Sequence, residues 1–194
     1  MTACPDPIDA AILADYWLGL LAGSDQDSIE EHFFACDPCS RRLRDITALA
    51  ESLRQLARSG SLRMIVSDTF LKRAAEEGLR VRQYAPMPGG SVECTVTAED
   101  DIVIGRLAAY LSGVQRVDLS LCNATGVEQV RMSNIPFDAS TGDVVYQESV
   151  TFLKAAPTNK MIARLITVDE AGRESLLGEY TFNHTRSLPG PGVW

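Results

Sequence analysis

One histidine and two cysteines lie close together in the chain, and their types and spacing are those of a metal site. His32, Cys36 and Cys39 form the pattern H-x-x-x-C-x-x-C within the segment EHFFACDPC. Imidazole nitrogen and thiolate sulfur are the ligands that zinc takes in structural sites, where four of them surround the ion as a tetrahedron. The pattern therefore predicts a zinc site that draws three ligands from one short segment.

The spacing also predicts how the backbone brings these side chains together. Residues four apart lie on one face of a helix, so His32 and Cys36 point the same way if they share a helix. Asp37-Pro38 interrupts that helix, because proline restricts the residue before it and suits the first turn of a new helix. Cys39 then lies at or near the start of the next helix, within reach of the same ion.

A closed tetrahedral site needs a fourth ligand. The only other histidine, His184, is far away in the sequence near a predicted strand end, where we expect it to be structural or exposed. Cys4 is the nearest remaining thiol, 28 residues before His32, so a Cys-His-Cys-Cys site is the simplest interpretation. Asp6 or Asp9 could serve instead, or the fourth position could stay open to water.

Four helices are predicted in the first part of the chain. Asp6 and Pro7 would start the first helix, and Gly23 would end it after about Ala22. The others are expected at about residues 26–36, at Cys39–Arg58, and from Ser67 or Asp68 to Glu77. Apolar residues at helical spacing predict the buried faces of the first and third helices: Ile8, Ile12, Tyr16 and Leu20, and then Leu43, Ile46, Leu49, Leu53 and Leu56.

After Gly78 the apolar period changes from that of a helix to that of a strand. Strands separated by turns rich in Gly, Pro, Asn and Asp are predicted at Leu79–Tyr84, Val92–Thr97, Ile102–Ala109, Arg116–Cys122, Glu128–Met132, Val144–Phe152, Met161–Val168 and Ser175–Asn183. This spacing is typical of an antiparallel β-sandwich, immunoglobulin-like or jelly-roll-like. We therefore expect an α+β fold of two domains, a small zinc-stapled helical bundle over residues 1–85 and a β-sandwich over residues 86–187, followed by a disordered tail at 188–194.

Acidic residues are concentrated at the N-terminus. Residues 1–40 hold eight acids and no Lys or Arg, so this segment alone accounts for the net charge of −8. A segment that binds nucleic acid would be basic, so we expect no direct contact with nucleic acid, whereas a basic protein partner would be attracted. A solvated acidic face without a partner explains the charge equally well.

Composition excludes several other classes. No apolar run approaches the roughly 20 residues that span a bilayer, and no signal peptide is evident. Five cysteines without a secretion signal argue against a disulfide framework, so we expect a cytoplasmic protein that does not bind membranes, with Cys94 and Cys122 buried in strands. The chain has neither a Ser-His-Asp order nor a glycine-rich phosphate loop, so we do not expect an enzyme.

The metal pattern and its surroundings resemble the zinc-binding anti-sigma domain of bacteria, a family with H-x-x-x-C-x-x-C across the second and third helices of a small bundle. His32, Cys36 and Cys39 match that motif residue by residue, and the preceding segment DYWLG looks similar. Cys4 would take the place of the family's upstream ligand, a few residues earlier than is usual. The resemblance covers under half of the chain.

The resemblance implies a function. Members of this family bind an extracytoplasmic-function (group IV) sigma factor, insert between its two conserved domains and block its access to RNA polymerase. The fourth helix, here about Ser67–Glu77, would contact one sigma domain, with Phe70 and Leu71 as candidate partner-binding residues, and the three-helix unit would contact the other. Many relatives are anchored in a membrane, but this chain resembles the soluble members, in which the protein itself responds to a cytosolic signal.

That signal could act in two ways. Oxidation of the thiols would release zinc and form a disulfide such as Cys4–Cys39, or a ligand would bind to the C-terminal domain. A metal-binding cupin, which some soluble relatives carry there, is not expected because His184 is alone in that part of the chain.

Two other functions are compatible with the same residues. A zinc-stapled module could be an interaction scaffold for a protein other than a sigma factor. Cys36 and Cys39 also have the spacing of a thioredoxin-like thiol redox pair, although that motif normally follows a strand and here follows a predicted helix.

Overall fold

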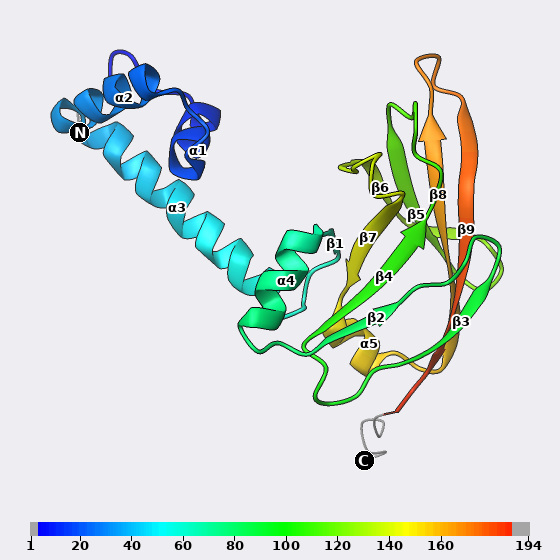
Figure 1. The fold of residues 1–194 in the computed structure, drawn as a ribbon. Helices are drawn as coiled ribbons and strands as arrows, with labels where there is room; N and C mark the ends of the chain where they lie inside the picture. Colours follow the sequence, from blue (N-terminus) through cyan, green and yellow to red (C-terminus); the bar gives the residue numbers. More distant parts are fainter. Residues whose placement is uncertain (1–3, 188–194) are drawn as a thin grey trace. The chain divides into compact units, whose positions relative to one another are not determined.

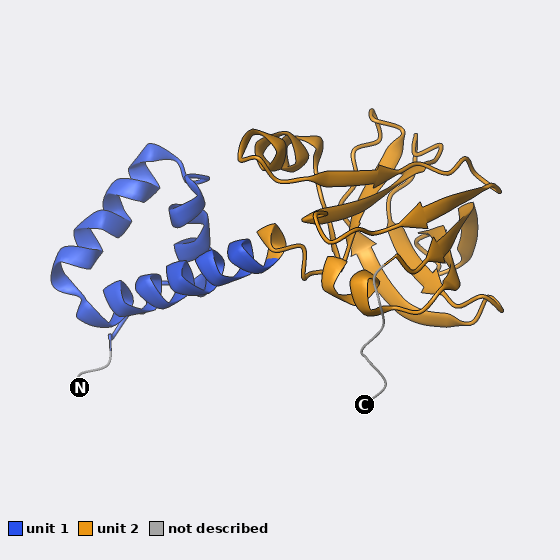
Figure 2. Ribbon diagram, turned by 90° about the horizontal axis from the view of Figure 1, so that it is seen from below, with its two compact units in different colours: residues 1–56 blue, residues 57–194 orange. Residues whose placement is uncertain are grey.

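The computed structural model describes residues 4–187 and divides into two compact units between Leu56 and Ala57 (Figures 1 and 2). The first, the helical unit, holds the predicted metal ligands near the N-terminus, and the second, the β-sheet unit, is built on two sheets. The fold is therefore α+β, as the sequence predicts. No helix within residues 4–187 combines the length and the apolar character needed to cross a membrane. The predicted tail lies outside the described residues.

The division falls earlier than the predicted boundary after residue 85. The segment that follows Leu56 is tied to the sheets, because the Gln147 amide donates hydrogen bonds to the carbonyls of Ala57 and Leu62, each at 3.1 Å. The backbone N–H of Val150 also donates to the Gly60 carbonyl at 2.7 Å. The chain thus joins the β-sheet unit directly after its third helix.

Three helices make up the helical unit: α1 (Ala10–Leu18), α2 (Gly23–Ala35) and α3 (Asp37–Arg58), whose last two residues lie past the division. The first helix is shorter than predicted. Asp9 caps it, since its carboxylate accepts the N–H of Ala11 at 2.7 Å, and Gly19 ends it in the left-handed conformation at φ +69°. Gly23, the predicted end, instead opens α2.

The helical unit has a small interior. Among residues 4–56, Leu13, Ile29, Cys36 and Cys39 are the buried side chains. Half-buried aromatic residues add contacts between the helices: Tyr16 packs edge-on against Phe33 with ring centroids 5.5 Å apart, and Arg54 lies over the Trp17 ring at 5.1 Å. The predicted apolar stripes are only partly covered, since Ile12, Leu20, Leu49, Leu53 and Leu56 are all 44% exposed or more.

The β-sheet unit has two sheets. One has the strand order β1 (Met64–Ile65), β7 (Asp143–Glu148), β4 (Ile102–Ala108), β2 (Val81–Tyr84). The other has the order β3 (Ser91–Thr95), β9 (Glu174–Thr185), β8 (Asn159–Val168), β5 (Val117–Cys122), β6 (Glu128–Ile135). Their inner faces share one hydrophobic core, with Leu107 and Tyr146 from the first sheet and Leu119, Leu165 and Phe182 from the second.

The sandwich is not purely antiparallel, which corrects the prediction. β2 pairs parallel with β4, and β3 pairs parallel with β9, while the other pairs are antiparallel. The chain leaves β2 for β3 in the other sheet and then returns as β4, so β2 and β4 enter their sheet in the same direction. The topology therefore departs from a simple antiparallel meander.

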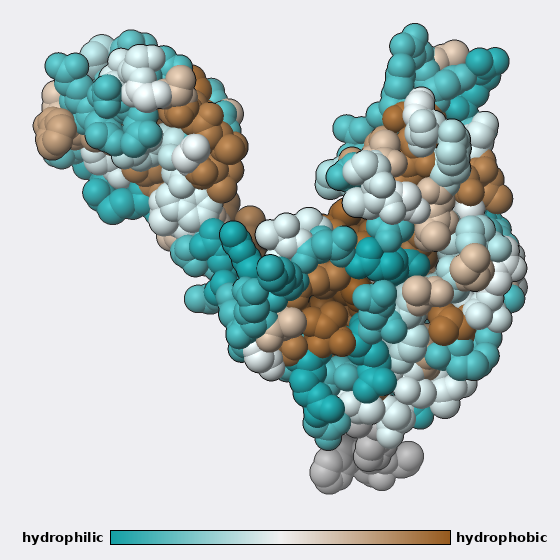
Figure 3. All heavy atoms as spheres, viewed as in Figure 1, coloured by the Kyte–Doolittle hydropathy of each residue, from teal (hydrophilic) through white to brown (hydrophobic). Residues whose placement is uncertain are grey.

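Two helices pack on the sheets. In α4 (Asp68–Glu76), Ser67 accepts the N–H of Phe70 at 3.2 Å, and the helix covers a second cluster of buried residues that includes Ile102, Ile104 and Val145. Hydrophobic surface is visible where α4, β2 and β4 meet (Figure 3).

In α5 (Val150–Ala155), the cap is Ser149. This helix takes the place of the end of the strand predicted at Val144–Phe152, because the cap turns the chain out of the sheet after Glu148.

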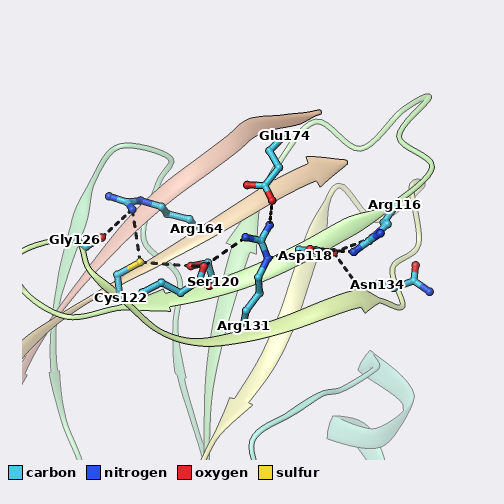
Figure 4. A network of polar contacts seen from close by, with 10 residues as sticks. Arg116, Asp118, Ser120, Cys122, Gly126, Arg131, Asn134, Arg164 and Glu174 are labelled. Carbon is cyan, nitrogen blue, oxygen red and sulfur yellow. Dashed lines mark hydrogen bonds and ion pairs between the residues drawn. The ribbon is translucent and has the colours of Figure 1, made fainter. Parts of the chain in front are cut away.

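The outer face of β5 is buried as well, under a network of polar side chains (Figure 4). Asp118 is 1% exposed and accepts hydrogen bonds from Arg116 at 3.1 Å, Arg131 at 3.0 Å and the backbone N–H of Asn134 at 2.8 Å. Burial raises the pKa of Asp118, but these hydrogen bonds outweigh it and bring the pKa below its ordinary value. The charged residues here cover a central strand and serve the fold.

Candidate metal centre

The backbone around the junction of α2 and α3 places three of the predicted ligands. His32 lies in the last turn of α2, Cys36 is the residue that ends it, and Cys39 lies in the first turn of α3. Pro38 lies in that first turn too, where its missing N–H leaves no hydrogen bond unmade. Ser40 joins the two helices, because its hydroxyl donates to the carbonyls of Phe33 at 3.3 Å and Cys36 at 3.1 Å.

Cys4 completes the group from the segment before α1. The ligand atoms of Cys4, His32, Cys36 and Cys39 all lie within 4.8 Å of one another. The Cys4 sulfur is 3.7 Å from Nε2 of His32. A tetrahedral zinc ion with bonds of about 2.3 Å to sulfur and about 2.1 Å to nitrogen requires an S···N separation of about 3.6 Å. The four side chains therefore have the donor types and the spacing of a metal site.

The carboxylates considered as alternative ligands lie elsewhere. Asp9 is engaged as the cap of α1, and Asp6 is not among the residues whose ligand atoms converge. Cys36 is 9% exposed and Cys39 is 2% exposed, so two of the sulfurs are shielded from solvent. All five cysteines are free thiols, and Cys94 and Cys122 are buried in strands, as predicted.

The thiols differ in acidity. A hydrogen bond from the backbone N–H of Cys39 lowers the pKa of Cys36 to about 7, with further contributions from Cys4, Cys39 and His32. Burial and the hydrogen bond with Cys36 raise the pKa of Cys4 to about 11. Without metal, Cys36 thus loses its proton before Cys4, and Cys4 acts as a hydrogen-bond donor to it. A bound cation would favour the deprotonated form of every thiol it contacts.

Phe70 and Leu71, the predicted partner-binding residues, lie on α4 in the β-sheet unit. Both are half-buried and pack against the cluster of Val66, Ala74 and Ile102 in the β-sheet unit. This contact within the chain accounts for their apolar character.

Two polar residues were not singled out as a functional pair from the sequence. His184, expected to be structural or exposed, is 4% exposed, and Glu148 is 3% exposed. Both line a cavity between the two sheets. The two-residue period of a strand carries a signal for them, because residues two or four apart lie on the same face. Glu148 thus shares a face with Val144 and Tyr146, and His184 shares one with Phe182, and these are the inner faces of the sheets. A polar residue at such a position is informative because it must be buried.

Comparison with known proteins adds little. No protein-family model matches the chain, and no curated protein sequence matches it. Among solved structures, the N-terminal domain of phage TP901-1 ORF48 is similar to it, with 15% sequence identity and a TM-score of 0.36, over 56% of this chain and 100% of that one. A likeness of that degree bears on neither the fold nor the function of this chain.

Proposed function

We propose that this chain is a cytoplasmic anti-sigma factor whose helical unit is stapled by zinc and sequesters an extracytoplasmic-function sigma factor. The observation that carries the proposal is the convergence of His32, Cys36, Cys39 and Cys4 within 4.8 Å. Three sulfurs and one imidazole are a donor set that suits zinc and not the hard cations, which take oxygen ligands. The zinc supplies folding energy, and the chain acts by occlusion, without catalysis.

Apolar side chains exposed on the helical unit support a protein partner. Phe34, between two of the ligands, is 93% exposed, and Leu20 is 69% exposed. Leu49, Leu53 and Leu56 recur at helical spacing on α3 and are 62%, 49% and 45% exposed. Exposed apolar side chains grouped on one element are typical of a protein interaction surface.

Charge supports the kind of partner. The eight acids of residues 1–40, without a Lys or Arg among them, would attract the basic surface with which a sigma domain contacts DNA. Because Phe70 and Leu71 pack against the β-sheet unit, we assign the main contact to the helical unit rather than to α4.

Release of the partner would follow from thiol chemistry. Cys36, with its pKa lowered to about 7, is the thiolate that would attack an oxidant such as hydrogen peroxide, giving a sulfenic acid and one water. The sulfenic acid would then condense with a second thiol of the set, Cys4 or Cys39, to form a disulfide and release a second water, so that two thiols lose two electrons and two protons in total. The centre would lose two ligands, and the metal with them.

The test combines metal analysis with a binding measurement. The reduced full-length protein is expected to carry one zinc ion in native mass spectrometry and to bind one of its host's alternative sigma factors, blocking transcription by the matching RNA polymerase holoenzyme. Phe34→Ala and Leu53→Ala should each weaken binding about tenfold or more, as is usual for a residue at the centre of an interface. Val127→Ala is the matched control, because Val127 is 57% exposed on the β-sheet unit.

Two results would contradict the proposal. Zinc-loaded protein that binds none of the host's sigma factors, yet captures another protein through Phe34, would indicate an interaction scaffold. Metal-free protein that reduces disulfides in a Cys36-dependent manner would indicate a thiol redox protein.

A further inference from the structure

A cavity of about 400 Å³ lies between the two sheets of the β-sheet unit. Its walls are mainly apolar and aromatic, and they come from both sheets and from α5: Tyr84, Val103, Leu121, Tyr146, Phe152 and Phe182 are among them. Cavities of this size with such walls are typical of sites for small molecules. Protein interiors are otherwise closely packed, so a void of this volume in a small domain calls for an explanation.

Two buried polar side chains that line the cavity have unused hydrogen-bonding atoms. Within residues 4–187, neither ring nitrogen of His184 has a hydrogen-bond partner, and Oε2 of Glu148 has none. The other carboxylate oxygen of Glu148 pairs with Arg63, whose guanidinium also lies 4.8 Å from the centroid of the Phe152 ring. Buried polar atoms without partners are rare and costly. Because these atoms lie at the wall of a cavity, we expect a molecule in the cavity to supply the hydrogen bonds that they lack.

The cavity has a rim of exposed residues at one end of the sandwich. Asn123 and Ala124, in the turn between β5 and β6, and Asn159 and Lys160, at the start of β8, are exposed and line the cavity. Asn159 lies opposite His184 in the β8–β9 pairing. Entry is therefore at the end of the sandwich that holds His184.

The unused atoms define the polar part of an occupant. A carboxylate paired with arginine accepts hydrogen bonds and donates none, so the occupant must bring an O–H or N–H to Glu148. Burial lowers the pKa of His184 and so favours the neutral ring, an effect that an interaction of the ring with the Leu153 backbone partly opposes. The ring nitrogen that does not face Leu153 is the one available to an occupant. A hydroxyl group, which both donates and accepts, can pair with either residue, whereas a carboxylate in place of the hydroxyl could not donate a hydrogen bond to Glu148.

We propose that the cavity of the β-sheet unit binds a small neutral molecule with an apolar body and a hydroxyl group, which Glu148 and His184 recognise. The occupant is of the phenol or alcohol class. This inference does not depend on the metal centre or on the sigma factor, because every residue that carries it belongs to the β-sheet unit.

The probe is 2-naphthol, which is neutral at pH 7, fits the apolar walls and carries one hydroxyl. Isothermal titration calorimetry with the reduced full-length protein should give a Kd of about 10–100 μM, the range expected for a molecule of this size in a preformed site. Naphthalene, which lacks the hydroxyl, should bind about tenfold more weakly, and 2-naphthoate more weakly still. Glu148→Gln should reduce the preference for 2-naphthol over naphthalene at least about threefold.

Location is tested by closing the rim. Ala124→Trp, at an exposed position that lines the cavity, should raise the Kd for 2-naphthol about tenfold or more. Ala171→Trp is the matched control, since Ala171 is exposed in the turn between β8 and β9 and does not line the cavity. Gln129→Trp, also exposed at the rim, repeats the test if circular dichroism shows that Ala124→Trp is misfolded.

The proposal is overturned if folded wild-type protein binds none of the three probes. It is equally overturned if naphthalene binds as tightly as 2-naphthol, if 2-naphthoate binds more tightly, or if both rim variants bind 2-naphthol as the wild type does.

Discussion

Removal of the metal should unfold the helical unit and leave the β-sheet unit folded. Apart from Cys36 and Cys39, the buried side chains among residues 4–56 are Leu13 and Ile29. Burial of two such residues contributes about 3–6 kcal/mol in total, whereas a structural zinc ion contributes about 10–16 kcal/mol of apparent binding free energy at pH 7. The ion is then the larger stabilising contribution, as is usual for units with so small a core.

The expected signal follows from the helix lengths. α1, α2 and α3 have 9, 13 and 22 residues, against 9 in α4 and 6 in α5. About three quarters of the helical residues therefore lie in the three helices joined by the metal centre. Chelation under reducing conditions should remove up to that share of the helical ellipticity at 222 nm, while the strand signal persists.

The assay is circular dichroism before and after a zinc chelator, with Trp17 fluorescence as a local probe. The chain has two tryptophans, so Trp194→Phe makes Trp17 the sole indole. Cys39→Ser should reproduce the chelated state without chelator, and Cys94→Ser, which replaces a buried thiol of the β-sheet unit, should not. If the metal-free, reduced protein keeps its full helical ellipticity, the helical unit is stable by itself and the reasoning is wrong.

Three further predictions concern the β-sheet unit. Asp118→Ala should lower the free energy of unfolding by about 2–4 kcal/mol in urea denaturation, because it leaves two arginines without their buried partner; a loss under about 0.5 kcal/mol would contradict this. Asp118 and Asp100 have pKa values below the ordinary value, since hydrogen bonds outweigh the opposing effect of burial, so the stability that these two residues contribute should be constant above about pH 5 and fall as the pH drops through their folded-state pKa values; denaturation midpoints that rise on acidification below about pH 5 would refute this sign. Gly105→Ala would place a Cβ 2.3 Å from the ring of Tyr146 and should lower the melting temperature, at a cost of about 1–3 kcal/mol, whereas Gly23→Ala, with nothing within 4 Å, is the control and should be neutral or slightly stabilising.

The cluster of Cys and His side chains was the part of the molecule that the sequence predicted best. The spacing of His32, Cys36 and Cys39 follows from helix geometry and from Pro38, which are local properties. Cys4 was a weaker inference, because its approach depends on how the segment before α1 returns to the junction of α2 and α3. That return is a tertiary property, which no local pattern contains.

Helix ends were predicted less well for a similar reason. Asp6 and Asp9 are both good cap residues, and Gly19 and Gly23 both suit a helix end, so local preference does not choose between them. In the structure Asp9 and Gly19 are the ones used. The sequence predicts strand where the structure has α5, because Val150–Phe152 continues an apolar run and the cap of the helix, Ser149, is a weak local signal.

The strand topology and the packing of α4 lay beyond local patterns. Parallel pairing of β2 with β4 depends on a passage of the chain through the other sheet. The packing of α4 on the sheets determines that Phe70 and Leu71 face a core within the chain. The cavity, by contrast, left a trace in the sequence, since Glu148 and His184 interrupt the apolar inner register of their strands.

The outermost strands of the two sheets bear on how the protein behaves at high concentration. β1 has two residues, β2 four and β3 five, and the β5–β6 pairing shifts its register twice. Free N–H and C=O groups along a long, straight outer strand can pair with strands of neighbouring molecules. Outer strands that are short or bulged offer few such groups in line, so this pairing is disfavoured. Fibril growth through these sheets would first have to straighten β6, so the native chain is expected to resist amyloid-like assembly even where it is crowded.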